Sequence, residues 1–283
     1  MTAAAANPFQ LLRTFKAARQ KKTHLHKIRE YRNFIDVNFE TDRFLVTTAK
    51  TGNQLLKVLE LRHEVFIEEW QGRRNLHGLD VDQYDFLGDH LLITDKERGE
   101  IVGTYRLLCS HFTHNFYSAS QFDISLFART PAVKLEMGRA CIKGDYRNGS
   151  TIDLLWKGLG RYIATSKADY LFGCSSLRNT DPSTISDLIL GMHEDGTWDD
   201  EFRIRPEPDY AFPGFLTEVG ERRPASERRN LLPPLLRSYL SAGAKVYGWP
   251  ALDREFACTD LFTILRWHQI NPRFKARFVD LPA

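Results

Sequence analysis

An arginine stands in the middle of an apolar helix face, where a buried leucine would be expected. The apolar residues of segment 55–66 recur at helical spacing, and Arg62 lies on the same side. Arginine does not lose its proton in proteins, so a buried one needs carboxylate partners. The acidic loop that follows supplies three of them. These are Asp80, Asp82 and Asp85.

Other charged residues interrupt apolar patterns further along the chain. Arg106 lies within a predicted strand, and Glu136 and Arg139 lie within another at 133–142. Because Glu136 and Arg139 are three apart, a regular pleat sends them to opposite faces, and a bulge at Gly138 would reorient one of them. Such a set predicts a buried charge network, which is either a structural ion-pair core or an active site.

The composition is that of a globular protein with one large domain, or with one domain and an elaboration. The chain has 283 residues, of which 42% are hydrophobic and 27% are charged. No apolar run reaches the roughly 18 residues that a membrane span needs, and no secretory signal is evident at the N-terminus. The four scattered cysteines predict reduced thiols, so we expect a cytoplasmic protein.

Residues 1–38 predict a basic helical arm. Between residues 13 and 32 the chain carries eight lysines and arginines against the single acid Glu30. The arm is either a solvated helix or a contact with an anionic membrane or an acidic partner. We expect peripheral membrane contact as one alternative, on the inner face of the inner membrane, and no nucleic-acid binding.

The remaining residues, 39–283, predict one mixed α/β domain. Helix and strand patterns follow each other as strand–helix–three strands–helix–strand–helix–strand, which indicates a central sheet with helices on both faces. Segment 170–177 is almost wholly apolar and predicts a central strand. Residues 196–283 are an extension, whose segments 244–249 and 256–267 predict strands that complete the sheet.

Two further features leave alternatives open. The loop Arg147-Asn148-Gly149-Ser150 precedes a helix and predicts either a phosphate cradle or a plain helix start. Cys174 is either an acyl-accepting nucleophile or a core thiol, and no histidine is tied to it by a recognisable spacing. We expect no metal site, because the histidines form no known ligand pattern.

The charged set resembles the pattern of the acyl-homoserine lactone synthases, which belong to the GNAT superfamily of N-acyltransferases. A closer resemblance is to the bacterial ornithine-lipid N-acyltransferases, and it covers most of residues 40–280. The string LPPLLRSYLSAGAKVYGWPALDREFACTDLF has no counterpart in the lactone synthases. The resemblance to the lactone synthases rests on the spacings Arg62-x3-Phe66-x3-Trp70, Asp82-x2-Asp85, Gly103-x2-Arg106 and Glu136-x2-Arg139. The closer resemblance rests on the string beginning LPPLLRSYL together with ELRHEVFIEEW and with GRACIKGDYRNGSTIDLLWKGLGRYI and YLFGCSSL.

This resemblance implies a GNAT-like, mostly antiparallel sheet and a direct, cofactor-free transfer. A 3-hydroxyacyl chain would pass from acyl carrier protein to the α-amine of L-ornithine, giving lyso-ornithine lipid. The alternatives are a lactone synthase, transfer to glycine, lysine or glutamine, and a non-catalytic module that binds carrier protein or membrane. Coenzyme A users of this superfamily commonly carry the loop pattern Q/R-x-x-G-x-G/A. No frame of the loop GDYRNGST satisfies all three of its positions, which fits a carrier-protein donor.

The resemblance also assigns residues to roles. Glu136 would act as general base, with Asp82 and Asp85 attracting the cationic acceptor. Backbone N–H groups around the predicted bulge would stabilise the thioester oxygen. The complete set is Glu136, Arg139, Asp82, Asp85 and Arg62 for catalysis; Arg106, Cys141, Arg147, Asn148, Gly149 and Ser150 for the acyl donor; and Phe66 and Trp70 for the acceptor or acyl pocket.

Overall fold

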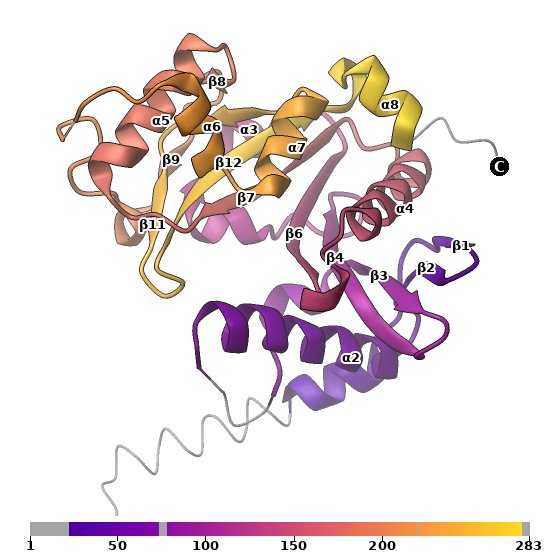
Figure 1. Cartoon of the computed structure of the whole chain (residues 1–283). Coiled ribbons are helices and arrows are strands. Elements are labelled where there is room, and N and C mark those ends of the chain that lie inside the picture. Colours follow the sequence, from indigo (N-terminus) through magenta and orange to yellow (C-terminus); the bar gives the residue numbers. More distant parts are fainter. Residues whose placement is uncertain (1–22, 74–77, 219, 279–283) are drawn as a thin grey trace, which may run out of the picture.

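A computed structural model describes residues 23–73, 78–218 and 220–278, and a mixed ten-stranded sheet crosses it (Figure 1). Neighbouring strands are antiparallel except for the pairs β6–β7 and β10–β8. The order is β1 (Asn38–Glu40), β2 (Phe44–Thr48), β3 (Asp89–Asp95), β4 (Glu100–Cys109), β6 (Lys134–Ile142), β7 (Tyr170–Leu177), β12 (Cys258–Arg266), β10 (Lys245–Tyr247) and β8 (Trp198–Asp199), with β11 (Ala251–Asp253) paired to β12.

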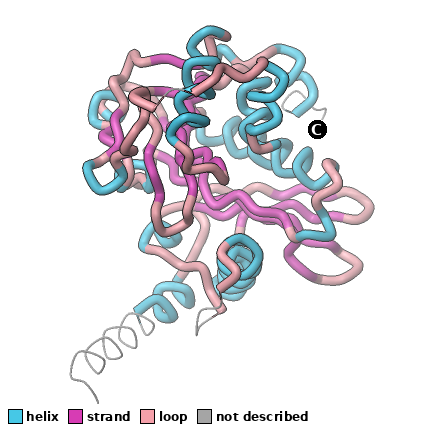
Figure 2. Tube along the Cα trace, turned by 60° about the vertical axis from the view of Figure 1, so that its left-hand side comes forward, coloured by secondary structure: helices cyan, strands magenta, loops and turns pink. Residues whose placement is uncertain are grey.

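Helices cover both faces of this sheet, because alternate strand residues are apolar on each side. On β3, Leu91 and Ile93 pack into the core that contains α4 (Ser150–Ser166), whereas Leu92 between them packs against α2 (Gly52–Arg62). Figures 1 and 2 show the two layers. The α4 face also carries α5 (Pro182–Glu194), α6 (Ala225–Leu231), α7 (Pro234–Ala242) and α8 (Pro272–Phe278).

The other face carries shorter elements besides α2. A π-helical segment, η1 (His63–Trp70), continues α2, and the 3-10 helices η2 (Gln83–Phe86) and η3 (Tyr117–Ser120) follow along the chain. The short helix α3 (Ser125–Ala128) and the two-stranded sheet of β5 (Phe122–Asp123) and β9 (Arg205–Pro206) complete this layer. The other short turns are η4 (Gly144–Tyr146), η5 (Pro208–Tyr210) and η6 (Trp267–Gln269).

The feature that positions the site is the divergence of β6 and β7. Their parallel pairing covers only three residues of each strand, Lys134–Glu136 with Tyr170–Phe172. Beyond that point β7 keeps its other neighbour, pairing with β12 through Leu177. At the vertex a Cβ on Gly173 would lie 2.3 Å from the carbonyl oxygen of Met137, so this close approach requires glycine. A gap therefore opens in the middle of the sheet.

The predicted fold class is confirmed, and the extension completes the sheet through β8, β10, β11 and β12. Residues 1–22 of the predicted arm lie outside the described residues. The described part of the arm packs on the domain, since Ile28 and Tyr31 are buried in the α2 core. A Cβ on Gly52 would lie 2.0 Å from the carbonyl oxygen of Ile28. Within the described ranges, no helix is long and apolar enough to cross a bilayer.

Candidate active site

A cavity of about 240 Å³ lies where β6 and β7 part. One half is apolar and faces α7, with Met137, Leu236 and Tyr239 in its wall. Tyr239 also forms a hydrogen bond through its hydroxyl to Tyr105 of β4. The other half is charged. It is lined by Arg106, Glu136, Arg139, Asp253 and Asp260.

A bulge in β6 brings Glu136 and Arg139 into the same cavity. Arg106 pairs with Gly138 and Thr104 pairs with Cys141, so one residue of β4 opposes two of β6. Arg139 lies in this bulge with a φ of 51°, a conformation that non-glycine residues rarely adopt. The bulge breaks the regular alternation, which explains how two residues three apart line one cavity.

Glu136 is buried, with 2% of its surface exposed, and is bound by η3. Its Oε1 accepts hydrogen bonds from the Ser118 amide at 2.7 Å and the Ser118 hydroxyl at 2.5 Å. Its Oε2 accepts from the Tyr117 amide at 2.6 Å. A carboxylate offers about four acceptor positions, so one remains on Oε2. Burial raises the pKa of Glu136, although the hydrogen bonds from Ser118 oppose the shift.

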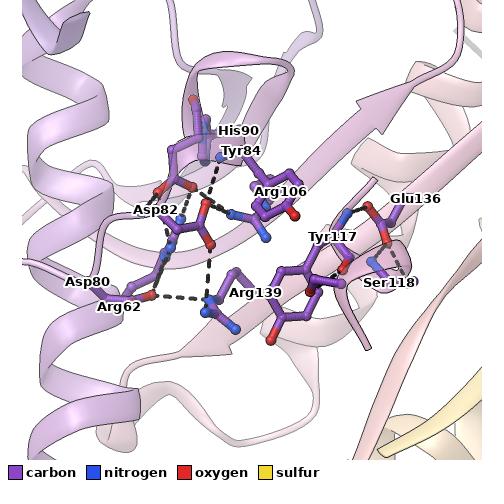
Figure 3. A network of polar contacts seen from close by, with 12 residues as sticks. Arg62, Asp80, Asp82, Tyr84, His90, Arg106, Tyr117, Ser118, Glu136 and Arg139 are labelled. Atoms are coloured by element: carbon purple, nitrogen blue, oxygen red, sulfur yellow. Dashed lines mark hydrogen bonds and ion pairs between the residues drawn. The ribbon is translucent and has the colours of Figure 1, made fainter. Parts of the chain in front are cut away.

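Behind the charged half lies a buried ion network (Figure 3). Arg62, which is fully buried, contacts Asp80 at 2.7 Å and Asp85 at 2.5 Å. Arg106 contacts the same Asp85 at 3.0 Å and Asp82 at 2.6 Å. Burial by itself would raise the pKa of Asp85, but the charges of Arg62 and Arg106 outweigh it and lower this pKa. The carboxylate is therefore ionised and held by two arginines.

The acidic loop is held in place by its own backbone. Asp82 and Asp85 form a capping box at η2, in which the Asp82 carboxylate accepts from the Tyr84 amide and the Asp85 carboxylate accepts from the Asp82 amide. His90 contacts the carbonyl oxygen of Asp85 at 3.0 Å through Nε2. Burial lowers the pKa of His90 to about 4, so its ring is neutral at physiological pH.

Arg139 lies between the network and the cavity. Its guanidinium faces the rings of Phe66, Tyr117 and Phe256 at 5.9, 5.1 and 5.4 Å from their centres. It also forms ion pairs with Asp80 at 3.3 Å and Asp82 at 3.7 Å. Figure 3 shows Arg139 between these aspartates and Tyr117. This guanidinium is thus positioned for an anionic group within the cavity.

Comparisons with known proteins agree with this geometry. Residues 61–157 match the acetyltransferase (GNAT) domain family. The chain is 31% identical over 248 residues to an L-ornithine N(alpha)-acyltransferase of Brucella abortus, covering 81% of this chain and 86% of that protein. It is 30% identical over 240 residues to the protein of the same name from Agrobacterium fabrum, covering 80% and 82%. The chain belongs to the L-ornithine N(alpha)-acyltransferase family.

A solved structure with partial similarity is that of the acyl-homoserine lactone synthase LasI. The TM-score is 0.48 at 14% identity, over 86% of this acyltransferase and 100% of that chain.

Of the residues predicted for the site of this acyltransferase, Phe66, Trp70, Arg106, Glu136 and Arg139 line the cavity. The predicted catalytic residues Arg62, Asp82 and Asp85 do not line it and form the network behind. Trp70 contacts Arg178, whose guanidinium lies 4.1 Å from its ring centre. Both Phe66 and Trp70 come from η1, and π-helical turns of this kind are frequent at functional sites.

Two of the predicted donor-binding residues lie elsewhere. Cys141 does not line the cavity but packs with Leu61 and Val65, since the bulge turns its side chain toward α2 and η1. Burial raises the pKa of Cys141 to about 12. Arg106 lines the charged half of the cavity rather than the donor loop, and it is bound there to Asp82 and Asp85, so its role in donor binding stays a prediction.

The rest of the predicted donor loop does form the start of α4. Gly149 is the N-cap with a φ of 88°, and no side chain caps this helix end. Ser150 donates a hydrogen bond to Asn148 at 2.8 Å, and Arg147 forms an ion pair with Glu69 at 2.6 Å. Free N–H groups at a helix start suit a phosphate, so the donor role of residues 147–150 stays a prediction.

Sequence reasoning missed the part of the cavity that the extension supplies. The hairpin of β11 and β12 contributes Asp253, Phe256, Cys258 and Asp260. The sequence did carry a signal for these residues. Two aspartates stand at the ends of the string DREFACTD, whose second half begins an otherwise apolar predicted strand. Cys174 also lines the cavity, and burial raises the pKa of its thiol well above the usual value, which disfavours a thiolate nucleophile.

Proposed function

We propose that this acyltransferase moves a 3-hydroxyacyl chain from acyl carrier protein to the α-amine of L-ornithine, giving lyso-ornithine lipid. The observation that carries the proposal is the cavity between β6 and β7, which is apolar toward α7 and charged toward η3. The apolar lining of the first half suits an acyl chain, and the charged lining of the second suits an amino acid. The curated relatives named L-ornithine N(alpha)-acyltransferase support the acceptor.

In this mechanism the acceptor nitrogen attacks the thioester carbonyl carbon. An amide bond forms and the carbon–sulfur bond breaks. The proton that the amine loses passes by way of Glu136 to the sulfur, so the carrier arm leaves as a thiol. Glu136 takes the proton from the amine through the acceptor position that remains on Oε2, and its raised pKa suits a base. Arg139 holds the acceptor carboxylate, and backbone N–H groups of the bulge stabilise the thioester oxygen. No cofactor is needed.

The ion network behind the cavity acts on the substrates only indirectly. It fixes the positions of Arg106 and Arg139, which line the cavity. Its members are Arg62, Asp80, Asp82 and Asp85. We therefore assign them as positioning residues. Removal of one partner from a buried ion pair leaves an uncompensated charge, so variants of Arg62 are expected to lose stability before they report on catalysis.

The test of Glu136 is Glu136→Gln, compared with Ser118→Ala. Glu136→Gln should lower kcat by about 10²- to 10⁴-fold for every acceptor, since a general base contributes that much. Ser118→Ala removes the hydroxyl donor but keeps the carboxylate, so its kcat should fall far less. Circular dichroism establishes that both are folded. Equal loss in the two variants would assign Glu136 to holding η3 rather than to proton transfer.

The test of the reaction itself is a lipid extract. A bacterial host that makes no ornithine lipid should, on expressing the chain, accumulate a ninhydrin-positive lysolipid whose head group is ornithine. Purified enzyme with 3-hydroxyacyl carrier protein and ornithine should give the same mass. A head group of glycine, lysine or glutamine, or a homoserine lactone in the medium, would contradict the proposed acceptor.

A further inference from the structure

The charged half of the cavity ends in an acidic pair that lacks a cationic partner. Asp253 and Asp260 are 4% and 3% exposed, and both line the cavity. Neither forms an ion pair with any residue that the structure describes. A buried carboxylate without a counter-charge is costly, and such a cost is expected where a ligand supplies the charge.

The two carboxylates are held by neutral groups alone. The Asp260 carboxylate accepts a hydrogen bond from the Ser176 hydroxyl at 2.5 Å. The Asp253 carboxylate accepts from the amides of Glu255 and Phe256, both at 2.9 Å, and from the Gln121 side chain at 3.2 Å. These contacts fix the orientation of the pair and leave its negative charge unbalanced.

Gln121 gives a second indication that a donor is missing. Its side chain is fully buried, and its amide nitrogen donates to Asp253. Its amide oxygen has no hydrogen-bond partner among the described residues. An unpartnered buried acceptor beside an unneutralised carboxylate is what remains when a group with several N–H donors is absent.

We propose that Asp260, supported by Asp253, binds the side-chain ammonium of a dibasic acceptor. This inference rests on the proposed transfer to ornithine and names the residues that recognise its second amine. They come from the extension, whereas Glu136 and Arg139 come from β6. The acceptor would then be held at three groups: its carboxylate at Arg139, its α-amine at Glu136 and its distal ammonium at Asp260.

The strand registers place both carboxylates on one side of the sheet. On β7, Phe172 pairs with Glu136, and Ser176 pairs with Asp260. Residues four apart on a strand point to the same face, and paired residues on neighbouring strands share that face. Glu136 and Asp260 therefore face the same side of the sheet, with β7 between their strands.

A metal ion suits the site at Asp253 and Asp260 less well than an ammonium group does. The side chains of Asp253, Cys258 and Asp260 bring their ligand atoms within 4.8 Å of one another. However, burial raises the pKa of Cys258, which disfavours the thiolate form that metals bind. Three hydrogen bonds to neutral donors already occupy most of the Asp253 carboxylate. An ammonium group needs fewer free acceptor positions than a metal ion.

The experiment compares two acceptors with two variants. Ornithine is compared with norvaline, which has the same carbon chain without the side-chain amine. Asp260→Asn keeps the shape of the side chain and removes its charge. Glu255→Gln is the matched control. It removes one negative charge from an exposed residue of the turn that joins β11 to β12. The wild-type enzyme should prefer ornithine, and Asp260→Asn should lower that preference in kcat/KM by about 10- to 100-fold.

In Asp260→Asn the loss of preference should come from a higher KM for ornithine, and kcat for norvaline should not change. Calorimetry without the acyl donor should show the same loss of ornithine binding. An equal fall in kcat for both acceptors would indicate that Asp260 acts as the base, and this would overturn the proposal. The proposal would also be overturned if the enzyme held one equivalent of a metal ion and needed it for activity. If wild-type enzyme acylates both acceptors equally, the inference fails while amino-acid acylation stands; if it acylates neither, the proposed function fails first. Asp253→Asn provides a second variant with the same expected direction if Asp260→Asn does not fold.

Discussion

At the scale of single residues, the cavity separates carboxylates with different environments. Asp85 is held by two arginines, which lower its pKa, whereas Asp260 has only neutral partners. Burial, aided by the charge of the nearby Asp253, raises the pKa of Asp260 to about 6 against the opposing effects of Ser176, Gln121 and Arg139. The two carboxylates therefore contribute to stability with opposite signs.

We predict that Asp260→Asn stabilises the free enzyme at neutral pH. Between pH 4 and 6 the folded wild-type protein binds more protons at Asp260 than the unfolded chain does, so its free energy of unfolding falls as pH rises. Asparagine does not titrate. The variant should therefore match the wild type near pH 4 and exceed it by about 2–3 kcal/mol at pH 7.

Urea denaturation at several pH values measures this difference, with Glu255→Gln as control. The control removes an exposed charge and should show a small difference that changes little with pH. A lower stability of Asp260→Asn than of wild type at pH 7 would show that the Asp260 charge is compensated within the free protein.

At the scale of secondary-structure elements, the bulge in β6 brings Glu136 and Arg139 together in the charged half of the cavity. A regular strand would send Arg139 away from Glu136, toward the core around α4. The left-handed backbone at Arg139 instead brings its guanidinium beside Phe66 and Tyr117. The bulge thus costs backbone strain, typically of order 1–3 kcal/mol, which the surrounding sheet must offset.

We predict that Arg139→Gly is more stable than Arg139→Ala by about 1 kcal/mol, because only glycine adopts a positive φ without strain. Both variants lose the guanidinium, so their difference isolates the backbone. The neighbouring Ala140 has no positive φ, and Ala140→Gly should destabilise. Thermal unfolding of the three variants checks this. If Arg139→Gly were the less stable of its pair, the bulge would be unstrained.

At the scale of the whole molecule, basic side chains surround the start of α4 on the α7 and α8 side. Arg229, Arg237 and Arg273 line a hollow there and form no ion pair in the described part of the chain. By contrast, Arg222, Arg223 and Arg228 contact Asp187 of α5 and are largely neutralised. The unpaired group lies beside the predicted donor loop and suits the acidic surface of a carrier protein.

We predict that Arg237→Glu raises KM for the proposed donor, acyl carrier protein, by roughly tenfold at low salt, because steering between opposite charges is lost. KM for ornithine should not change, and the difference should shrink as salt screens the charges. Lys57→Glu, which makes the same charge change on the exposed side of α2, is the control. An equal rise in KM for both variants would indicate a general effect of net charge.

Much of this molecule was predictable from sequence. Strands such as β7 and helices such as α4 carry clear apolar periods, and Arg62 in an apolar face correctly indicated a buried ion network. The position of Arg139 was not predictable in detail, because a positive φ at arginine depends on the surrounding sheet. Asp260 was missed because its place depends on the register of β12 against β7, which joins residues more than 80 positions apart.

The same register has a consequence for synthesis on the ribosome. Strand β7 pairs with β6 over only three residues, so most of its backbone hydrogen bonds go to β12. Until Arg266 has left the exit tunnel, that apolar edge is without its partner. We expect the nascent chain to be vulnerable to aggregation over this interval, and to acquire its acceptor-binding groups only as the edge is closed.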